Sequence, residues 1–316
     1  MSRIVITGGA GFIGSHLAEH LCRYGHEVVV VDNLDSYYPM EYKKRNLDFV
    51  LKYNNASFVK GDICNLDFLK TVIDKKTDYV FHEAAQPGVR FSVVNPFKPN
   101  NVNILGTLNV LQCSLEADVE RLINASSSSI YGKVEYLPFD EKHPTQPISP
   151  YAVSKLAAEH YCRVFYEIYG LPTVSLRYFT VYGPRMRPDL AIYIFTEKML
   201  KNEPINIYGD GTQTRDFTYI DNIIDCNIKL IDSDKADGKV LNIGEGKRTN
   251  INEIVDYLKE IIDSSSEIRY VEAQKGDAKH TLANIDLAKK LIGYEPKIDI
   301  SEGLRKFVLW FKEFVT

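Results

Sequence analysis

Two side chains that can take part in proton transfer, Tyr151 and Lys155, stand four positions apart in the run Tyr-Ala-Val-Ser-Lys. The surrounding sequence predicts a helix over residues 151–169, in which this spacing puts both side chains on one face, one turn apart. Free tyrosine has a pKa near ~10, too high for a base at neutral pH, but a nearby ammonium favours the phenolate. Tyr151 is therefore a candidate general base. In a chain with 20 tyrosines, such a pair alone usually marks only a helix surface.

Four consecutive serines, residues 126–129, follow a strand predicted over residues 122–125. At the carboxyl end of a parallel strand, hydroxyls point into the crevice where ligands bind. They are neutral donors and acceptors, which suits them to hold a substrate hydroxyl without competing for its proton. Ser127, Ser128 and Ser129 are therefore candidate substrate ligands, although the run in isolation would indicate only a polar turn.

The glycine-rich segment of residues 7–14 lies between a short apolar strand, residues 4–6, and a helix predicted over residues 12–24. Glycines in this spacing allow a tight turn and let the backbone approach a pyrophosphate at a helix N-terminus. A second strand, residues 28–31, ends on an acidic residue placed to accept a hydrogen bond from a ribose 2′-hydroxyl and to repel a 2′-phosphate. The pattern predicts a dinucleotide site that prefers NAD over NADP, formed by Gly8, Gly11, Phe12, Ile13, Gly14 and Asp32.

Strand-like and helical runs alternate through the first 180 residues, which predicts a parallel sheet covered on both faces. We expect an α/β protein with a Rossmann-type doubly wound sheet over residues 1–177 and a smaller α/β substrate-binding region over residues 178–316. Strand exchange from the second region back to the first is left open. Further expected strands are residues 58–59, 79–81, 122–125, 173–176, 205–208 and 217–220, and expected helices are residues 66–75, 101–117, 151–169, 195–201, 252–262 and 301–314.

Composition excludes several classes of protein. The 316 residues are 45% hydrophobic and 25% charged, and their net charge of −4 gives no general attraction to nucleic acid or an anionic membrane. No run approaches the ~20 apolar residues of a membrane span, and no signal peptide is expected. The five cysteines form no CxxC pair, and no cluster has metal-ligand spacing. We expect a cytoplasmic protein without a metal site.

An ordered series of motifs spans nearly the whole chain: TGGAGFIGSHL at 7–17, VDNL at 31–34, GDI at 61–63, HEAAQ at 82–86, SSSSIYG at 126–132, SPYAVSK at 149–155, LRYFTVYGP at 176–184 and GDGTQTRDFTYIDN at 209–222. The series resembles the extended short-chain dehydrogenases/reductases, and within them the nucleotide-sugar 4-epimerases. The resemblance implies bound NAD, a UDP-sugar substrate, and a homodimer formed through the helices near 101–117 and 151–169. It implies a catalytic triad of Ser127, Tyr151 and Lys155. It extends the cofactor contacts to Asn33, Asp62, Ile63, Ala84, Ala85, Gln86, Tyr151, Lys155 and Tyr178, with Asp62 and Ile63 beside the adenine.

The resemblance also assigns the substrate diphosphate to Arg215. A UDP-sugar carries two phosphate charges, and a chain with net negative charge needs dedicated cations to bind it. Lys275 is a candidate second cation, because it follows Gln274, where the family often has an arginine. Asp277 belongs to the same predicted substrate segment. A structural role on a surface strand is the alternative for Arg215.

Three reactions of such enzymes share one first step, the oxidation of sugar C4 by hydride transfer to NAD⁺. Dehydratases of this kind have Asp-Glu just after the catalytic hydroxyl, and UDP-glucuronate decarboxylases usually keep a glutamate there, whereas this chain has Ser128 and Ser129. With no carboxylate to drive elimination, we expect the hydride to return to the opposite face of the ketone, which is 4-epimerisation. A 4-keto-sugar reductase would need exchangeable NAD(P)H. A non-catalytic NAD-binding regulator would not need Tyr151 or Lys155.

The sugar is predicted from three segments. Thr180 stands where glucose-type epimerases commonly have asparagine. Residues 183–191, residues 86–92 with Arg90, and the segment beginning at Tyr37-Tyr38 resemble those of UDP-glucuronate 4-epimerases. We expect interconversion of UDP-glucuronate and UDP-galacturonate, with UDP-glucose/UDP-galactose or a UDP-N-acetylhexosamine as the alternative.

A glucuronate needs a cation or several donors at its C6 carboxylate, and Arg187, Thr180 and a serine hydroxyl would supply them. Because the 4-keto sugar is then a β-keto acid, a carboxylate held with its C–C bond near the ketone plane would be protected from decarboxylation. Two alternatives stay open. Arg187 could instead pair with Asp189, and the charged residues 37–53 are either a solvated surface helix or part of the active-site mouth.

Overall fold

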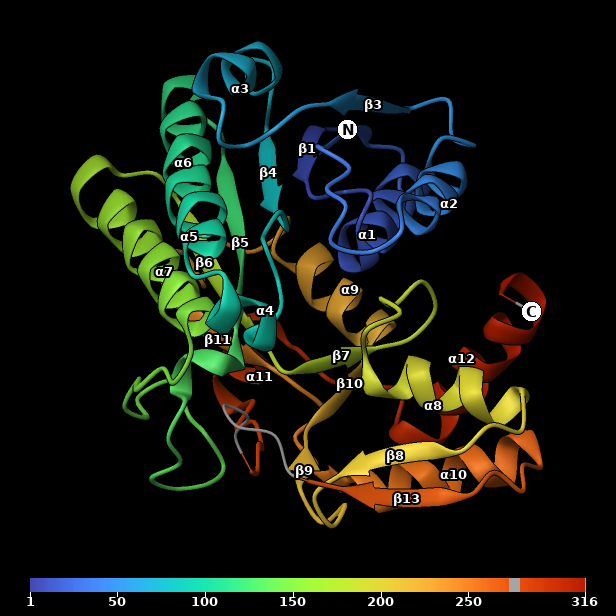
Figure 1. The fold of residues 1–316 in the computed structure, drawn as a ribbon. Coiled ribbons are helices and arrows are strands. Elements are labelled where there is room, and N and C mark those ends of the chain that lie inside the picture. Colours follow the sequence, from blue (N-terminus) through green and yellow to red (C-terminus); the bar gives the residue numbers. More distant parts are fainter. Residues whose placement is uncertain (273–278, 316) are drawn as a thin grey trace.

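The protein is built around a seven-stranded sheet (Figure 1), and the computed structural model describes residues 1–272 and 279–315. The strand order is β11-β6-β5-β4-β1-β2-β3, and every neighbouring pair is parallel. The order reverses direction at β1, which confirms the predicted doubly wound, Rossmann-type sheet. The strands are β1 (Arg3–Thr7), β2 (Glu27–Asp32), β3 (Ala56–Lys60), β4 (Tyr79–His82), β5 (Arg121–Ser127), β6 (Thr173–Tyr178) and β11 (Val240–Ile243).

Helices cover both faces of this sheet, so its central strands are buried on both sides, whereas the edge strand β3 is partly exposed. Adjacent residues of β1 show the two cores, because Ile4 and Ile6 pack in one hydrophobic cluster and Val5 packs in the other. One face carries α3 (Leu66–Val72), α6 (Gly106–Ala117) and α7 (Pro150–Tyr169), on the left in Figure 1, and the other carries α1 (Phe12–Arg23), α2 (Met40–Val50) and α9 (Ile220–Lys229).

The later part of the chain forms a smaller layer below the sheet in Figure 1 and also returns to the sheet. β11 pairs with β6, and α9 packs on α1, so both complete the first layer. The division at residue 177 stays a prediction. The other elements are α4 (Val89–Val94), α5 (Phe97–Pro99), η1 (Asn100–Leu105), η2 (Ser128–Tyr131), β7 (Thr180–Tyr182), α8 (Ala191–Leu200), β8 (Ile205–Tyr208), β9 (Thr214–Arg215), β10 (Phe217–Tyr219), β12 (Thr249–Asn250), α10 (Ile251–Ile262), β13 (Ile268–Val271), α11 (Asp286–Ile292) and α12 (Ile300–Phe314).

Several predicted elements differ in extent: the helix expected over residues 66–75 ends at Val72, and the helix expected over residues 101–117 is divided into η1 and α6. The helix expected over residues 195–201 is α8, which begins at Ala191. The strand expected over residues 217–220 ends at Tyr219, because Ile220 begins α9, a helix that was not predicted. The buried isoleucines of α9 at 220, 223 and 224 do have helical spacing, but the apolar strand directly before them obscured the signal.

A buried ion pair fixes α7 to the sheet. Arg177 on β6 donates to Glu159 on α7, from Nε at 3.1 Å and from Nη2 at 2.5 Å. We expect Glu159→Ala to lower the free energy of unfolding by about 3 kcal/mol, because it leaves the guanidinium buried without its anion. Urea denaturation measures this loss. Glu197→Ala, which removes an exposed pair with Lys201, is the control and should cost under about 1 kcal/mol. Equal losses would contradict the assignment.

Candidate active site

The glycine-rich segment joins β1 to α1 along a path that excludes side chains. Gly8 has a φ of +72°, and a Cβ on it would lie 2.5 Å from the nitrogen of Ala84, just after β4. A Cβ on Gly14, in the first turn of α1, would lie 2.5 Å from the Gly8 carbonyl oxygen. Glycine is therefore required at both positions for the turn to pack this closely, and Gly8, Gly11 and Gly14 border the cavity at the N-terminus of α1, where a pyrophosphate would bind.

Asp32, at the end of β2, borders the same cavity and is held in place by α2. The Nζ of Lys43 lies 3.2 Å from Asp32 Oδ1, and two backbone N–H groups also donate to the carboxylate. Next to it, Asn33 Nδ2 donates to Asp62 at 3.0 Å. The sequence did not single out Lys43, because nothing distinguishes it from the lysine that follows it. The segment of residues 37–53, which contains α2, thus reaches the site through Tyr37, Tyr38 and Lys43.

An elongated cavity of about 340 Å³ runs past the carboxyl ends of the central strands. Of the predicted cofactor and catalytic residues, the structure leaves only Asp62 off its wall, where Gly61 and Ile63 flank it. Lys43 and Glu83 line the cavity without having been predicted. The predicted residues that line it are Gly8, Gly11, Phe12, Ile13, Gly14, Asp32, Asn33, Ile63, Ala84, Ala85, Gln86, Ser127, Tyr151, Lys155, Tyr178, Thr180 and Arg187.

Tyr151 is positioned by the signal that starts α7. Ser149 caps the helix, because its side chain accepts a hydrogen bond from the Ala152 N–H at 3.2 Å. Pro150 occupies the first helical position, where its missing N–H costs nothing. The capping sequence therefore fixes Tyr151 in the first turn, where it borders the cavity.

The three predicted catalytic side chains meet where β5 ends. Ser127 lies close enough to Tyr151 to lower its pKa, and its Oγ donates to Ser129 Oγ at 3.1 Å. One turn along α7, the buried Nζ of Lys155 donates to the Ala125 carbonyl at 2.7 Å. The structure therefore brings a phenol, a hydroxyl and an ammonium to one end of the cavity.

The electrostatics of this end differ in one respect from the expectation. Burial raises the pKa of Tyr151, whereas the Ser127 side chain and the Arg187 guanidinium lower it. Burial also lowers the pKa of Lys155 to about 8, opposed by the carboxylate of Glu83. The cation that favours the phenolate is thus Arg187, a contribution that the sequence assigned to Lys155.

The pKa of Lys155 predicts how activity depends on pH. The ammonium is lost as pH rises through about 8, so we expect kcat/KM for the sugar substrate to fall over the same range. Lys155→Arg should move that fall to higher pH in whatever activity remains, because a guanidinium stays protonated. The measurement is the pH profile of both proteins. An unchanged alkaline limb in the arginine variant would contradict the assignment.

A second hollow, of about 110 Å³, adjoins the first at Thr180, which lines both. Its wall brings together Ser128, Ser129 and Arg215 from the predicted substrate set. Arg215 donates from Nη1 to the carbonyls of Thr214 and Lys279, at 2.9 and 3.2 Å. Arg90 of α4, also from the predicted substrate set, lines neither hollow. Its guanidinium lies 5.1 Å from the ring centre of Tyr208.

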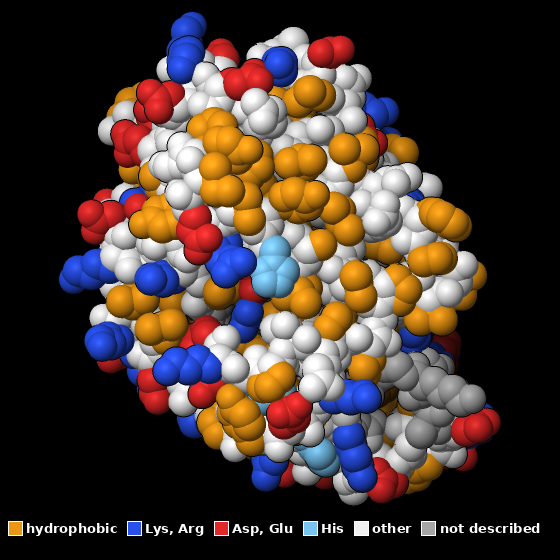
Figure 2. Space-filling model, turned by 90° about the vertical axis from the view of Figure 1, so that its left-hand side faces the viewer, with side chains coloured by type: hydrophobic (Ala, Val, Ile, Leu, Met, Phe, Trp, Pro, Cys, Tyr) orange, Lys and Arg blue, Asp and Glu red, His pale blue; other side chains and the backbone are white. Residues whose placement is uncertain are grey.

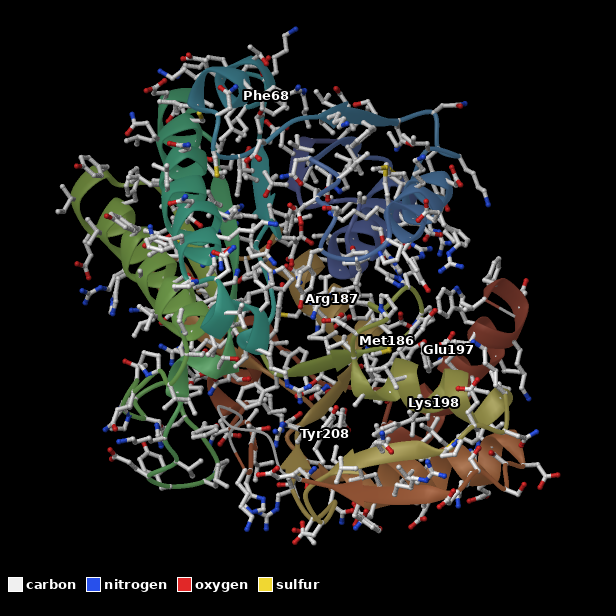
Figure 3. All side chains as sticks on the ribbon, viewed as in Figure 1. Phe68, Met186, Arg187, Glu197, Lys198 and Tyr208 are labelled. Carbon is white, nitrogen blue, oxygen red and sulfur yellow. The ribbon has the colours of Figure 1, made fainter. Side chains whose placement is uncertain are left out.

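Arg187 pairs with Asp189, which was one of the two sequence-based interpretations, and its role as a carboxylate receptor stays a prediction. It borders the main cavity in the middle of the molecule (Figure 3), and its Nε and Nη2 donate to the carboxylate of Asp189 at 2.9 and 3.1 Å. The hydroxyl of Tyr37 donates to the same carboxylate at 3.2 Å, and the guanidinium lies 5.7 Å from the Tyr37 ring centre. Asp189 and Tyr37 together hold Arg187 at the mouth.

Two predicted substrate residues, Lys275 and Asp277, lie outside the described residues. Within residues 1–272 and 279–315, no group of three or more His, Cys, Asp or Glu side chains could hold a metal ion. All five cysteines have free thiols. Among the described helices, none has an apolar stretch sufficient for a membrane span.

Comparison with known proteins places this site in a family. Residues 5–307 match the family described as GDP-mannose 4,6 dehydratase. The UDP-glucuronate 4-epimerase of Thermodesulfobacterium geofontis is 41% identical over 317 residues, 99% of this chain and 97% of that protein. The crystal structure of the Bacillus cereus UDP-glucuronic acid 4-epimerase in complex with UDP-glucuronic acid and NAD has a TM-score of 0.94 at 37% identity, covering 98% of this chain and 99% of that one. The crystal structure of the Thermotoga maritima UDP-glucose 4-epimerase with UDP-glucose has a TM-score of 0.92 at 36% identity, covering 99% and 100%. The chain therefore belongs to the GDP-mannose 4,6 dehydratase family, within the extended short-chain dehydrogenases/reductases.

Proposed function

We propose that the protein is an NAD-dependent isomerase that interconverts UDP-glucuronate and UDP-galacturonate by 4-epimerisation. The observation that carries the proposal is the position of Arg187, which borders the same cavity as Tyr151, Lys155 and Ser127. A cation at that point is suited to a sugar carboxylate. The relative from Thermodesulfobacterium geofontis and the Bacillus cereus structure, both UDP-glucuronate 4-epimerases, support the same assignment.

The cofactor site fits NAD. Gly8, Gly11 and Gly14 line the cavity at the N-terminus of α1, where a pyrophosphate would bind, and Asp32 offers carboxylate oxygens to ribose hydroxyls. Asp62 and Ile63 would flank the adenine. When bound there, NAD⁺ supplies a hydride acceptor from which the hydride can return to the same sugar.

The chemistry then falls to the side chains at the end of β5. Tyr151 takes the proton of the sugar 4-hydroxyl as the C4 hydride leaves, and Ser127 holds the oxygen on which the ketone forms. The Arg187 guanidinium lowers the pKa of Tyr151 and so favours the phenolate, and Lys155, one helical turn away, places a buried ammonium at the same end of the cavity. After the 4-keto sugar has rotated to present its opposite face, Tyr151 returns the proton to the same oxygen.

Ser128 and Ser129 separate this reaction from elimination or decarboxylation. They occupy the second hollow with Thr180, and neither is a strong base at neutral pH. Arg215, on the same wall, would bind the diphosphate, with Arg90, Lys275 and Asp277 in the same substrate set. Pinning of the carboxylate by Arg187 and Thr180 would keep the 4-keto acid from losing CO₂.

A neutral UDP-hexose is the second candidate. Arg187 already has a carboxylate partner in Asp189, so its charge stays balanced when the C6 group of the sugar is uncharged. The Thermotoga maritima UDP-glucose 4-epimerase has the same fold, in keeping with this alternative.

We further propose that the enzyme acts in the cytoplasm as a homodimer joined through α6 and α7. Hydrophobic side chains gather in patches on the face that carries these helices (Figure 2). Val153, Tyr161 and Tyr169 of α7 are 50%, 37% and 55% exposed, whereas Phe165 is buried in the core. A dimer would cover such a surface. Light scattering on the purified protein tests the proposed association.

The test of the function is product analysis with no added cofactor. Purified protein is incubated separately with UDP-glucuronate, UDP-glucose and UDP-N-acetylglucosamine, and the products are separated by chromatography. Fastest conversion of UDP-glucuronate to UDP-galacturonate, without release of a pentose, supports the proposal. Turnover confined to the neutral sugars overturns the role of Arg187 but keeps the mechanism. Release of UDP-xylose overturns the role given to Ser128 and Ser129.

A further inference from the structure

A carboxylate that the mechanism above does not use lies in the wall of the cofactor cavity. Glu83 follows β4 directly and borders the cavity together with Lys155 and Tyr178. Its backbone N–H donates to the Thr7 carbonyl at 3.0 Å, which extends the pairing of β4 with β1 by one residue. The strand pairing therefore fixes the backbone position of Glu83, so its carboxyl group is a permanent part of the cavity wall.

A series of hydrogen bonds connects Glu83, through Tyr178, to Asn227 on α9. The Nδ2 of the fully buried Asn227 on α9 donates to the Tyr178 hydroxyl at 2.8 Å, and that hydroxyl lies 3.1 Å from Glu83 Oε1. The hydroxyl has one proton, which either Glu83 or Asn227 Oδ1, also at 3.1 Å, can accept. An ionised Glu83 is the stronger acceptor, so the chain favours its charged form.

Few charges balance Glu83 within the described part of the chain. Lys155 is the cation that acts on it, and the Lys155 ammonium is itself bonded to a neutral carbonyl, that of Ala125. The preceding His82 adds no charge near neutral pH, because burial lowers its pKa to about 3. Burial raises the pKa of Glu83 to about 7, while Tyr178 and Lys155 oppose that rise. A further positive charge in the cavity would complete the ionisation of Glu83.

We propose that Glu83 is the counter-charge of the oxidised nicotinamide and biases the bound cofactor toward NAD⁺. Reduction removes the positive charge of the nicotinamide ring, so a fixed carboxylate in the cavity stabilises the oxidised form over the reduced form. The C4 hydride leaves the sugar with its electron pair and returns to it, and the bias favours the return. The 4-keto sugar therefore stays a minor species and has little time to escape or lose CO₂. The inference rests on the cofactor part of the proposed function and not on the identity of the sugar.

The test is the midpoint potential of the cofactor in the holoenzyme, measured by equilibration with a redox dye and without any sugar. We expect Glu83→Gln to raise the potential by about 30 mV, which is a tenfold shift toward the reduced cofactor for a two-electron couple. Glu83→Asp, which keeps the charge, should stay closer to the wild-type potential. Tyr178→Phe removes the hydrogen bond but not the charge and should shift the potential less than Glu83→Gln.

A matched control is Glu141→Gln, which neutralises a carboxylate that accepts the Asn242 N–H away from the cavity. It should leave the potential unchanged. Glu83→Leu gives a second neutral variant in case glutamine disturbs folding, and it must shift the potential in the same direction. An unchanged potential in either neutral variant with full cofactor occupancy overturns the proposal. Loss of cofactor from both would also overturn it, because Glu83 would then be a binding group. Failure of the wild-type protein to bind NAD would instead refute the proposed function.

Discussion

Replacement of Tyr151 by phenylalanine is expected to lower kcat for 4-epimerisation by at least about a thousandfold, while NAD stays bound. The change removes the phenol oxygen of Tyr151. The start of α7 places this side chain at the cavity, next to Ser127. General acid–base catalysis by a positioned group contributes about 10²–10⁴-fold, and here one group serves both half-reactions. The ring, its packing and the capping of α7 by Ser149 are kept, so the fold should be unaffected.

The measurement is single-turnover product formation, together with cofactor content from the absorbance of the denatured holoenzyme. Tyr270→Phe is the control, because Tyr270 on β13 is exposed at the surface and lines neither hollow. It should retain the wild-type rate. Turnover of the Tyr151 variant within tenfold of wild type would refute the assigned base, and loss of NAD would mean that the hydroxyl serves binding instead.

Replacement of Arg187 by methionine is expected to lower kcat/KM for UDP-glucuronate by about 10- to 100-fold and to change kcat/KM for UDP-glucose much less. Hydrogen bonds to a charged group contribute about 1.5–3 kcal/mol, which corresponds to this range. Methionine keeps much of the apolar stem of arginine, so the loss isolates the guanidinium. The pairing of Arg187 with Asp189 and Tyr37 means that the carboxylate of the sugar must share or displace an anion already present.

Steady-state kinetics on both substrates tests this prediction. Arg269→Met is the matched control, since Arg269 is an exposed arginine paired with Glu267 on the surface. It should change neither value. Because Arg187 also lowers the pKa of Tyr151, a smaller loss is expected on UDP-glucose as well. Equal losses on UDP-glucuronate and UDP-glucose would show that Arg187 acts only through Tyr151 or the diphosphate and not on the carboxylate.

The sheet and the glycine-rich turn could be predicted from local sequence alone. Buried parallel strands appear as short β-branched runs, and Gly8, Gly14 and Asp32 stand at fixed offsets from two of them. The start of α7 is likewise local, since Ser149 and Pro150 form a recognisable helix start.

Other features depended on contacts between distant segments. Lys43 is held by its ion pair with Asp32, and Glu83 accepts a hydrogen bond from Tyr178. No local sequence pattern identifies either of these pairs. Arg187 shows the same limit, because the sequence offered a carboxylate receptor and an ion pair with its near neighbour as alternatives, and the fold shows that the ion pair with Asp189 forms on the wall of the cavity. Strand β11 was not predicted, and only a return of the second region to the sheet was left open, because pairing with β6 depends on the path of the chain between distant segments.

The most direct test of the account is the fate of the hydrogen at C4. UDP-glucuronate carrying deuterium at C4 is incubated with the purified holoenzyme in ordinary water, and the UDP-galacturonate formed is analysed by mass spectrometry and NMR. Removal and return of a hydride within one active site predicts that the product keeps the deuterium at C4. Loss of the label to solvent, with hydrogen from water at C4, would contradict the proposed mechanism.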